Sequence, residues 1–217
     1  MMDGLRFNKL WQRRLGSGGE SAFRRLEALY GEPHRHYHSP VHIEHCLRQF
    51  DSAAAGMPNA DAVEMALWFH DAIYVVSGNP APDNEQRSAE LFLECAAERG
   101  TEQFRSDVYR LIVVTDHREP PSAPDECYVV DIDLSSFGLP WPEFLRNSHD
   151  LRAEQPAQPD DEYYQNQESF LRGLLDRPVF CFTRFFRERH EQTARDNIVR
   201  YLGMDKPLKP SASPPAA

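Results

Sequence analysis

Residues 61–75 read DAVEMALWFHDAIYV, the most apolar predicted helix of the chain. Apolar side chains recur there at steps of three and four residues, at Ala62, Met65, Ala66, Phe69 and Ile73. This spacing predicts an α-helix that packs into a core. His70 and Asp71 stand in the middle of it. Because a buried carboxylate is costly unless it is paired or bound to a metal, Asp71 is either a metal ligand or a cap for a neighbouring helix, with His70 packed beside it.

Helical periodicity also dominates the rest of the chain, whereas evidence for strands is weak. Beyond 61–75, we expect helices at about 5–15, 20–30, 40–54, 84–99, 101–115, 125–137, 141–154, 160–176 and 183–202. The length of 217 residues fits one domain. We therefore predict a single all-α domain over residues 1–203. Residues 204–217 are rich in Pro, Ser and Ala, which predicts a disordered tail.

The charge and composition exclude several classes of function. The formal net charge is -10, which argues against nucleic acid as a main partner because phosphate backbones require clustered Lys and Arg. No apolar stretch reaches the roughly 20 residues needed to span a bilayer, so we expect no membrane association. Four scattered cysteines form no CxxC pair and predict reduced thiols. No targeting segment is visible, and we expect a cytoplasmic protein.

Histidines and aspartates in three further places are candidate metal ligands. Five histidines lie between residues 34 and 45: His34, His36, His38, His42 and His45. Asp131 and Asp133 lie in an apolar segment that is itself predicted to be helical. Since they are two positions apart, they point roughly 200° apart on a helix, and only one can face a metal directly. A mixed set of nitrogen and oxygen ligands suits Mn, Fe, Co, Ni or Zn, with Mg less comfortable.

One histidine, then His-Asp, then a distal aspartate, each on its own helix, resembles the arrangement of the HD superfamily. Further stretches resemble a bacterial family of predicted metal-dependent HD phosphohydrolases, over roughly residues 30–200. They are 32–38 with His42 and Ile43, 66–74, Asn84-Glu85 with Ser88-Ala89, Thr115 with His117, 131–134 with Gly138, and 151–154. Gln155 departs from the family pattern, in which an aromatic residue is expected.

The resemblance implies a helical bundle in which His42, His70, Asp71 and a distal aspartate hold one divalent metal. An Ala-Asp-x-Leu pattern in other HD proteins favours Asp133, with Asp131 as the alternative. The element Tyr37-His38-Ser39-Pro40-Val41-His42 is similar in spacing to one in cyclic-nucleotide phosphodiesterases. That similarity implies His38 as the proton donor to a leaving group. The alternative for His38 is a surface histidine of a loop.

Other residues are candidates with a structural alternative beside each. Glu85 could accept a proton from water or bind a second metal, or it could be a glutamate that favours a helix N-terminus. Arg35 is a phosphate candidate because guanidinium binds oxyanions in a bidentate manner. His117 could also meet a phosphate, or could cap the end of a helix.

The leading expectation is a metal-dependent phosphohydrolase that acts on a small phosphorylated molecule, a nucleotide being one candidate. Two alternatives stay open. Some HD-type proteins resemble di-iron oxygenases, in which case His117, Glu85 and His45 would hold the second iron. The third is a non-catalytic module that senses a nucleotide or a metal. The oligomeric state is not predicted.

Overall fold

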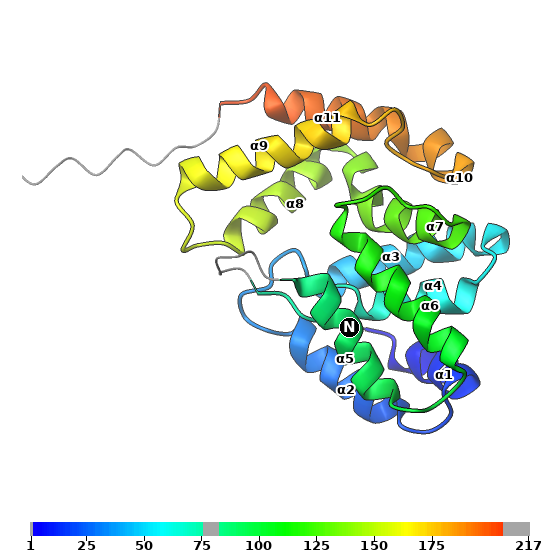
Figure 1. The fold of residues 1–217 in the computed structure, drawn as a ribbon. Helices are drawn as coiled ribbons and strands as arrows, with labels where there is room; N and C mark the ends of the chain where they lie inside the picture. Colours follow the sequence, from blue (N-terminus) through cyan, green and yellow to red (C-terminus); the bar gives the residue numbers. More distant parts are fainter. Residues whose placement is uncertain (1, 76–82, 206–217) are drawn as a thin grey trace, which may run out of the picture.

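The computed structural model describes residues 2–75 and 83–205, and in these ranges every regular element is helical (Figure 1). This confirms the predicted all-α fold. Residues 76–82, between the helices predicted at 61–75 and 84–99, and residues 206–217 of the predicted tail lie outside the described residues.

The helices begin and end close to the predicted positions, with one exception at residues 61–75. They are α1 Gly4–Arg14, α2 Gly19–Tyr30, α3 Pro40–Ala53, α4 Ala60–Phe69, α5 Asn84–Ala96, α6 Glu102–Val113, α7 Pro124–Leu134, α8 Trp141–Ala153, α9 Asp160–Asp176, α10 Arg184–Phe186 and α11 Gln192–Leu202. Four short turns complete the set: η1 Ala54–Gly56, η2 Val114–Asp116, η3 Ser135–Gly138 and the π-helical η4 Arg187–Glu191.

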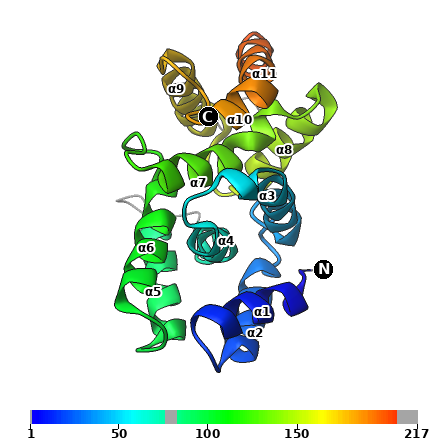
Figure 2. The same ribbon diagram turned by 90° about the vertical axis from the view of Figure 1, so that its right-hand side faces the viewer.

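Helix α4 is the centre of the molecule. Figure 2 shows it end-on, with α1, α3, α5, α6 and α7 around it, and each of these helices contacts it. All residues from Ala62 to Phe69 are buried. The one charged residue among them, Glu64, pairs with Arg6 at 2.7 Å. A helix that is apolar on every side is stable only inside a core, and that is where α4 lies.

Helix α4 ends at Phe69, so the prediction that it continues to residue 75 is wrong. Several backbone groups from Asp71 onward bind side chains from elsewhere, which takes the place of helical hydrogen bonds. The carbonyls of Asp71 and Ala72 accept from Arg35, at 2.6 and 2.7 Å. The N–H of Ile73 donates to Ser88 Oγ at 2.9 Å. His70 and Asp71 therefore lie at the end of the core helix and not in its middle.

The last third of the chain covers the opposite side of α3 and α7 from α1 and α2. Figures 1 and 2 show α8, α9 and α11 together at that end. Helix α11 contacts α8, α9 and η3, which follows directly on α7. None of the helices in residues 2–75 and 83–205 is long and apolar enough to cross a membrane.

Phe7 joins α1 and α2 to the central helix. Its ring centroid lies 5.5 Å from those of Trp11 and Phe23, 5.4 Å from that of Trp68 and 6.2 Å from that of Phe69. Its side chain is completely buried. Removing the ring would leave a cavity between α1, α2 and α4.

We expect Phe7→Ala to lower the free energy of unfolding by about 3–5 kcal/mol, measured by urea denaturation. Leu5→Ala is the matched control on the same helix. Leu5 is 67% exposed, and its loss should change stability by less than about 0.5 kcal/mol. Equal effects of the two variants would contradict the packing described for α1.

Candidate metal centre

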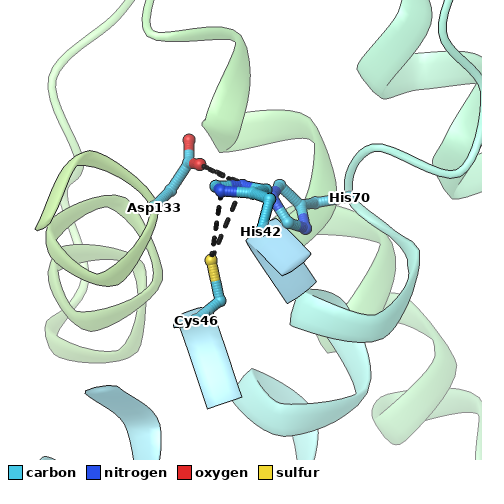
Figure 3. Close-up of side chains that lie close together, drawn as sticks. All are labelled: His42, Cys46, His70 and Asp133. Atoms are coloured by element: carbon cyan, nitrogen blue, oxygen red, sulfur yellow. Dashed lines mark hydrogen bonds and ion pairs between the residues drawn. The ribbon is translucent and has the colours of Figure 1, made fainter. Parts of the chain in front are cut away.

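Four polar side chains from three helices converge beside the end of α4. His42 comes from α3, His70 and Asp71 from the end of α4, and Asp133 from α7. Figure 3 shows His42, His70 and Asp133 pointing toward one another. His42 and His70 are 4% and 1% exposed. The structure thus brings together the four residues of the leading ligand prediction.

The distances in this cluster match the spacing of ligands around one ion. His42 Nε2 and His70 Nε2 are 3.1 Å apart. Asp71 Oδ2 lies 3.3 and 3.0 Å from these two nitrogens, and Asp133 Oδ1 lies 3.3 and 3.4 Å from them. A transition metal binds nitrogen and oxygen at about 2.0–2.2 Å, so adjacent ligand atoms lie about 3.0–3.5 Å apart. The five distances fall within that range.

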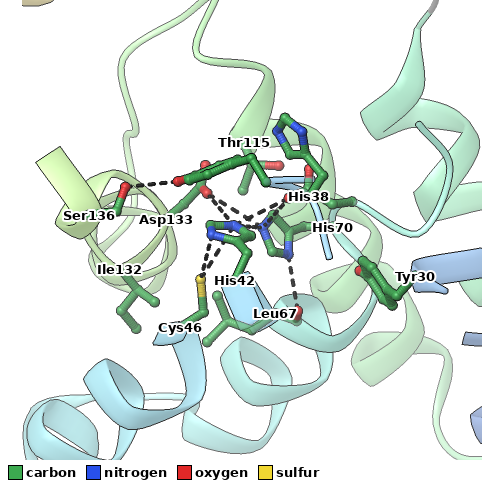
Figure 4. Close-up of polar contacts among 12 residues, drawn as sticks. Tyr30, His38, His42, Cys46, Leu67, His70, Thr115, Ile132, Asp133 and Ser136 are labelled. Atoms are coloured by element: carbon green, nitrogen blue, oxygen red, sulfur yellow. Dashed lines mark hydrogen bonds and ion pairs between the residues drawn. The ribbon is translucent and has the colours of Figure 1, made fainter. Parts of the chain in front are cut away.

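A hydrogen bond of the ring nitrogen Nδ1 determines which nitrogen of His70 carries the proton. Nδ1 of His70 lies 3.0 Å from the carbonyl oxygen of Leu67, and a carbonyl only accepts, so Nδ1 donates (Figure 4). In the neutral ring, Nε2 then carries a lone pair directed at the cluster. This arrangement is typical of histidines that bind metals.

Electrostatics also favour a cation at this point. Burial opposes ionisation of Asp71 and Asp133, but the hydrogen bonds and charges of the surrounding histidines outweigh it and hold both pKa values well below the ordinary value. Burial likewise opposes protonation of His70, yet Asp71 and Asp133 raise its pKa well above the ordinary value. The cluster therefore stabilises positive charge, which a divalent metal would supply.

Cys46 lies one helical turn beyond His42 on α3 and is also a possible ligand. Its Sγ is 3.6 Å from His42 Nε2 (Figure 3). His42, Cys46, His70 and Asp133 form a group that could hold a metal ion. The sequence predicted Cys46 only as a reduced thiol, although its i,i+4 spacing from His42 was a usable signal. There are thus two candidate sets of four ligands. His42, His70 and Asp133 belong to both, and the fourth ligand is Asp71 in one set and Cys46 in the other.

Asp131, the alternative distal ligand, is directed away from the cluster. Its carboxylate accepts from the backbone N–H groups of Phe182 and Thr183 and from the Thr183 hydroxyl, each at 2.7 Å. It thereby fixes the segment before α10. The roughly 200° between residues two apart on a helix explains why Asp131 and Asp133 serve different neighbours.

Arg35, predicted to bind phosphate, has no surface from which to do so. Its side chain is completely buried. Besides the carbonyls of Asp71 and Ala72, it donates to the carbonyl of His38 and to Glu32, at 3.3 and 3.0 Å. With its donors occupied in this way, the prediction of phosphate binding is wrong. Arg35 instead ties the histidine loop to the end of α4.

His117 reaches the cluster through Asp133. Its Nε2 lies 2.9 Å from Asp133 Oδ2, the oxygen that does not face the two histidine nitrogens. Its backbone is in the left-handed region, with φ 57°. Such a conformation is uncommon outside glycine, so the position of this ring is held by its surroundings. The contact makes His117 a support for Asp133, which differs from the predicted direct contact with phosphate.

His38 is paired with Glu154, which is completely buried and directly follows α8. Glu154 Oε1 accepts from the backbone N–H groups of residues 36, 37 and 38, each at 2.8 Å. Glu154 Oε2 lies 2.6 Å from His38 Nδ1. Burial opposes its charge, but these hydrogen bonds prevail and lower the pKa of Glu154. The ring of His38 lies 6.1 Å from that of His42, beside the cluster (Figure 4).

Two further candidates have different surroundings. Burial, together with the negative charges of Asp71 and Asp116, raises the pKa of Glu85, which places it in the electrostatic field of the cluster. Its role as a base stays a prediction. His45, a candidate for a second iron, lies 2.8 Å from the hydroxyl of Ser135. Because that hydroxyl donates to the carbonyl of Ile132, His45 Nε2 donates to Ser135.

Comparisons of the chain with protein-family models, curated proteins and solved structures found no match.

We expect the purified chain to bind about one transition-metal ion and Asp133→Asn to lose it, because Asp133 closes the donor set. Asp131→Asn is the matched control and should retain the metal, although it loses a contact that supports α10. Elemental analysis after reconstitution with Mn, Co or Zn measures both. Asp71→Asn and Cys46→Ala in the same assay distinguish the two donor sets. Asp71 lies closer to the histidine nitrogens than Cys46 does, so we expect Asp71→Asn to lose the metal and Cys46→Ala to retain it.

We expect metal affinity to fall by about tenfold or more per pH unit between pH 8 and pH 6. A metal requires neutral imidazole, whereas Asp71 and Asp133 hold the pKa of His70 well above its ordinary value. Binding must therefore release a proton, and lower pH opposes it. Calorimetry in two buffers with different ionisation enthalpies counts the protons released. An affinity independent of pH would contradict the charge distribution described above.

Proposed function

We propose that this protein is a metal-dependent phosphohydrolase of the HD type, acting on a small phosphorylated molecule. The observation that carries the proposal is the cluster of two imidazoles and two carboxylates with the His38–Glu154 pair beside it. The ordered motifs that resemble HD phosphohydrolases support it. The net charge of -10 adds a reason for a metal, because an acidic chain repels a phosphate unless a local cation offsets the charge.

A divalent ion held by the cluster would act as a Lewis acid toward the phosphoryl oxygens and would lower the pKa of a water molecule that attacks phosphorus. His70 fits this task because its proton on Nδ1 leaves Nε2 free. His117 fixes the orientation of Asp133 through the outer carboxylate oxygen. Such supporting contacts usually affect metal affinity and activity almost as much as the ligands.

His38 is the proton donor to the leaving oxygen. Glu154 holds Nδ1 and directs the other nitrogen away from itself. The ring packs against Tyr74, with centroids 4.0 Å apart, which restricts its rotation. Arg35 binds the carbonyls of both His38 and Asp71, so the proton donor and one ligand are held by the same guanidinium.

We expect His38→Gln to lower kcat for an alkyl phosphate by about 10²–10⁴, because an alkoxide leaves poorly without a proton. The loss should be much smaller for p-nitrophenyl phosphate, whose leaving group needs no proton. Initial rates with Mn²⁺, Co²⁺ and Zn²⁺ measure both.

His36→Gln is the matched control. His36 is exposed, and it contacts Glu154 only through its backbone N–H. Equal losses of His38→Gln on both substrates would assign His38 a role other than proton donor. The absence of hydrolysis with every metal and substrate of a broad panel would overturn the proposed function.

A further inference from the structure

The thiol of Cys46 lies on the same face of α3 as the candidate ligand His42. The two residues are four positions apart, and side chains at that spacing share one face of a helix. Pairs of donors at this spacing bind a single zinc ion in helical metalloprotease sites. Helix α3 also contacts α4 and α7, beside which the other candidate ligands lie. Figure 3 shows the sulfur directed at the ring of His42.

The distances around the thiol fit a metal ligand. Cys46 Sγ lies 3.6 Å from His42 Nε2. Zinc binds sulfur at about 2.3 Å and nitrogen at about 2.0–2.1 Å, so a sulfur and a nitrogen on one tetrahedral ion lie about 3.6 Å apart. Donor atoms of Cys46, His42, His70 and Asp133 all lie within 4.8 Å of one another. The thiol is therefore within reach of an ion that the histidines hold.

The contacts of Cys46 distinguish it from an ordinary buried cysteine. Free cysteines usually pack in cores as small hydrophobic side chains. Cys181, which is 1% exposed, belongs to the core in this way. Cys46 is completely buried too, but within residues 2–75 and 83–205 its sulfur makes its hydrogen-bonding contacts with the two ring nitrogens of His42, at 3.6 and 3.9 Å. Its sulfur thus contacts a candidate ligand and no backbone carbonyl in the described chain.

Donors of two chemical kinds surround the two histidines. The side chains of Asp71 and Asp133 are 14% and 15% exposed, whereas Cys46 is completely buried. Carboxylates suit hard cations such as Mg²⁺ and Mn²⁺, while thiolate is a soft ligand that favours Zn²⁺. Imidazole also suits Zn²⁺. Two imidazoles and a thiolate together therefore shift the preference of the centre toward the softer ion.

We propose that Cys46 is a ligand of the metal and makes the centre prefer Zn²⁺ to a hard cation such as Mn²⁺. When Zn²⁺ binds, the S–H bond breaks, a sulfur–zinc bond forms, and the proton passes to solvent. Mn²⁺ gains little from a thiolate and is held by Asp71, Asp133 and the histidines. A variant without the thiol thus keeps a metal and loses the preference. The proposal concerns the choice of ion and holds whether or not the protein hydrolyses phosphate esters.

The first test identifies the atoms that bind zinc. X-ray absorption of the full chain loaded with about one Zn²⁺ should show a sulfur neighbour at about 2.3 Å. Cys46→Ser should lose this sulfur, and Cys181→Ser, the matched control, should keep it. Cys181 is equally buried, and its thiol is outside the group of candidate ligands. Only nitrogen and oxygen neighbours in the wild type would overturn the proposal, and that result does not depend on how a variant folds.

The second test measures the preference itself. Competition with a chelator gives the Kd of Zn²⁺ and of Mn²⁺ for the wild type, Cys46→Ser and Cys181→Ser. Serine nearly preserves the size of the side chain and replaces the soft sulfur by a hard oxygen. Cys46→Ser should weaken Zn²⁺ binding by about tenfold or more, since even supporting contacts of a ligand are worth that much. Its affinity for Mn²⁺ should change little, and Cys181→Ser should keep both values.

Equal weakening of Zn²⁺ and Mn²⁺ binding by Cys46→Ser would overturn the proposed selectivity, because lost packing around α3 affects both ions alike. An unchanged affinity for Zn²⁺ in Cys46→Ser would overturn the assignment of Cys46 as a ligand. Neither result bears on the proposed hydrolysis, which the assays with His38→Gln test separately.

Discussion

The burial of α4 on all sides is the constraint on which the rest of the structure depends. An all-apolar helix must be enclosed, and α1, α3, α5, α6 and α7 enclose it. The helix nevertheless ends at Phe69, and the carbonyls of Asp71 and Ala72 in the segment that follows need donors. Arg35 supplies them from a loop far away in sequence. The same arginine therefore completes the core and holds the polar residues at its edge.

The sequence predicts most of the fold because helical periodicity is a local property. Helices α8 and α9 lie within a residue or so of the predicted ranges, and α7 with η3 covers the range predicted as one helix. The end of α4 could not be predicted, since it depends on the side chains of Arg35 and Ser88, which only the folded chain brings there. Intrinsic preference favoured a longer helix, and tertiary hydrogen bonds prevailed.

The candidate site, like the fold, was predicted from the sequence only in part. Residue type marked the histidines and aspartates as candidates, and the resemblance to the HD arrangement combined His42, His70, Asp71 and Asp133 into one ligand set. Roles that depend on contacts between elements far apart in the chain could not be predicted from the sequence. Arg35 and His117 were predicted to meet a ligand, and they instead hold groups that belong to the cluster. A polar residue near a site in sequence gives no indication of which of its donors are already occupied.

The hydrogen bonds from residues 36–38 to Glu154 have a consequence for the order in which the site is assembled during synthesis. The carboxylate binds the loop at residues 36–38 across a separation of 116 to 118 residues. All four residues of the cluster leave the ribosome before it does. A nascent chain that ends between residues 133 and 154 contains every candidate ligand and lacks the group that orients His38. The proton donor of the proposed reaction is thus the last part of the centre to acquire its place.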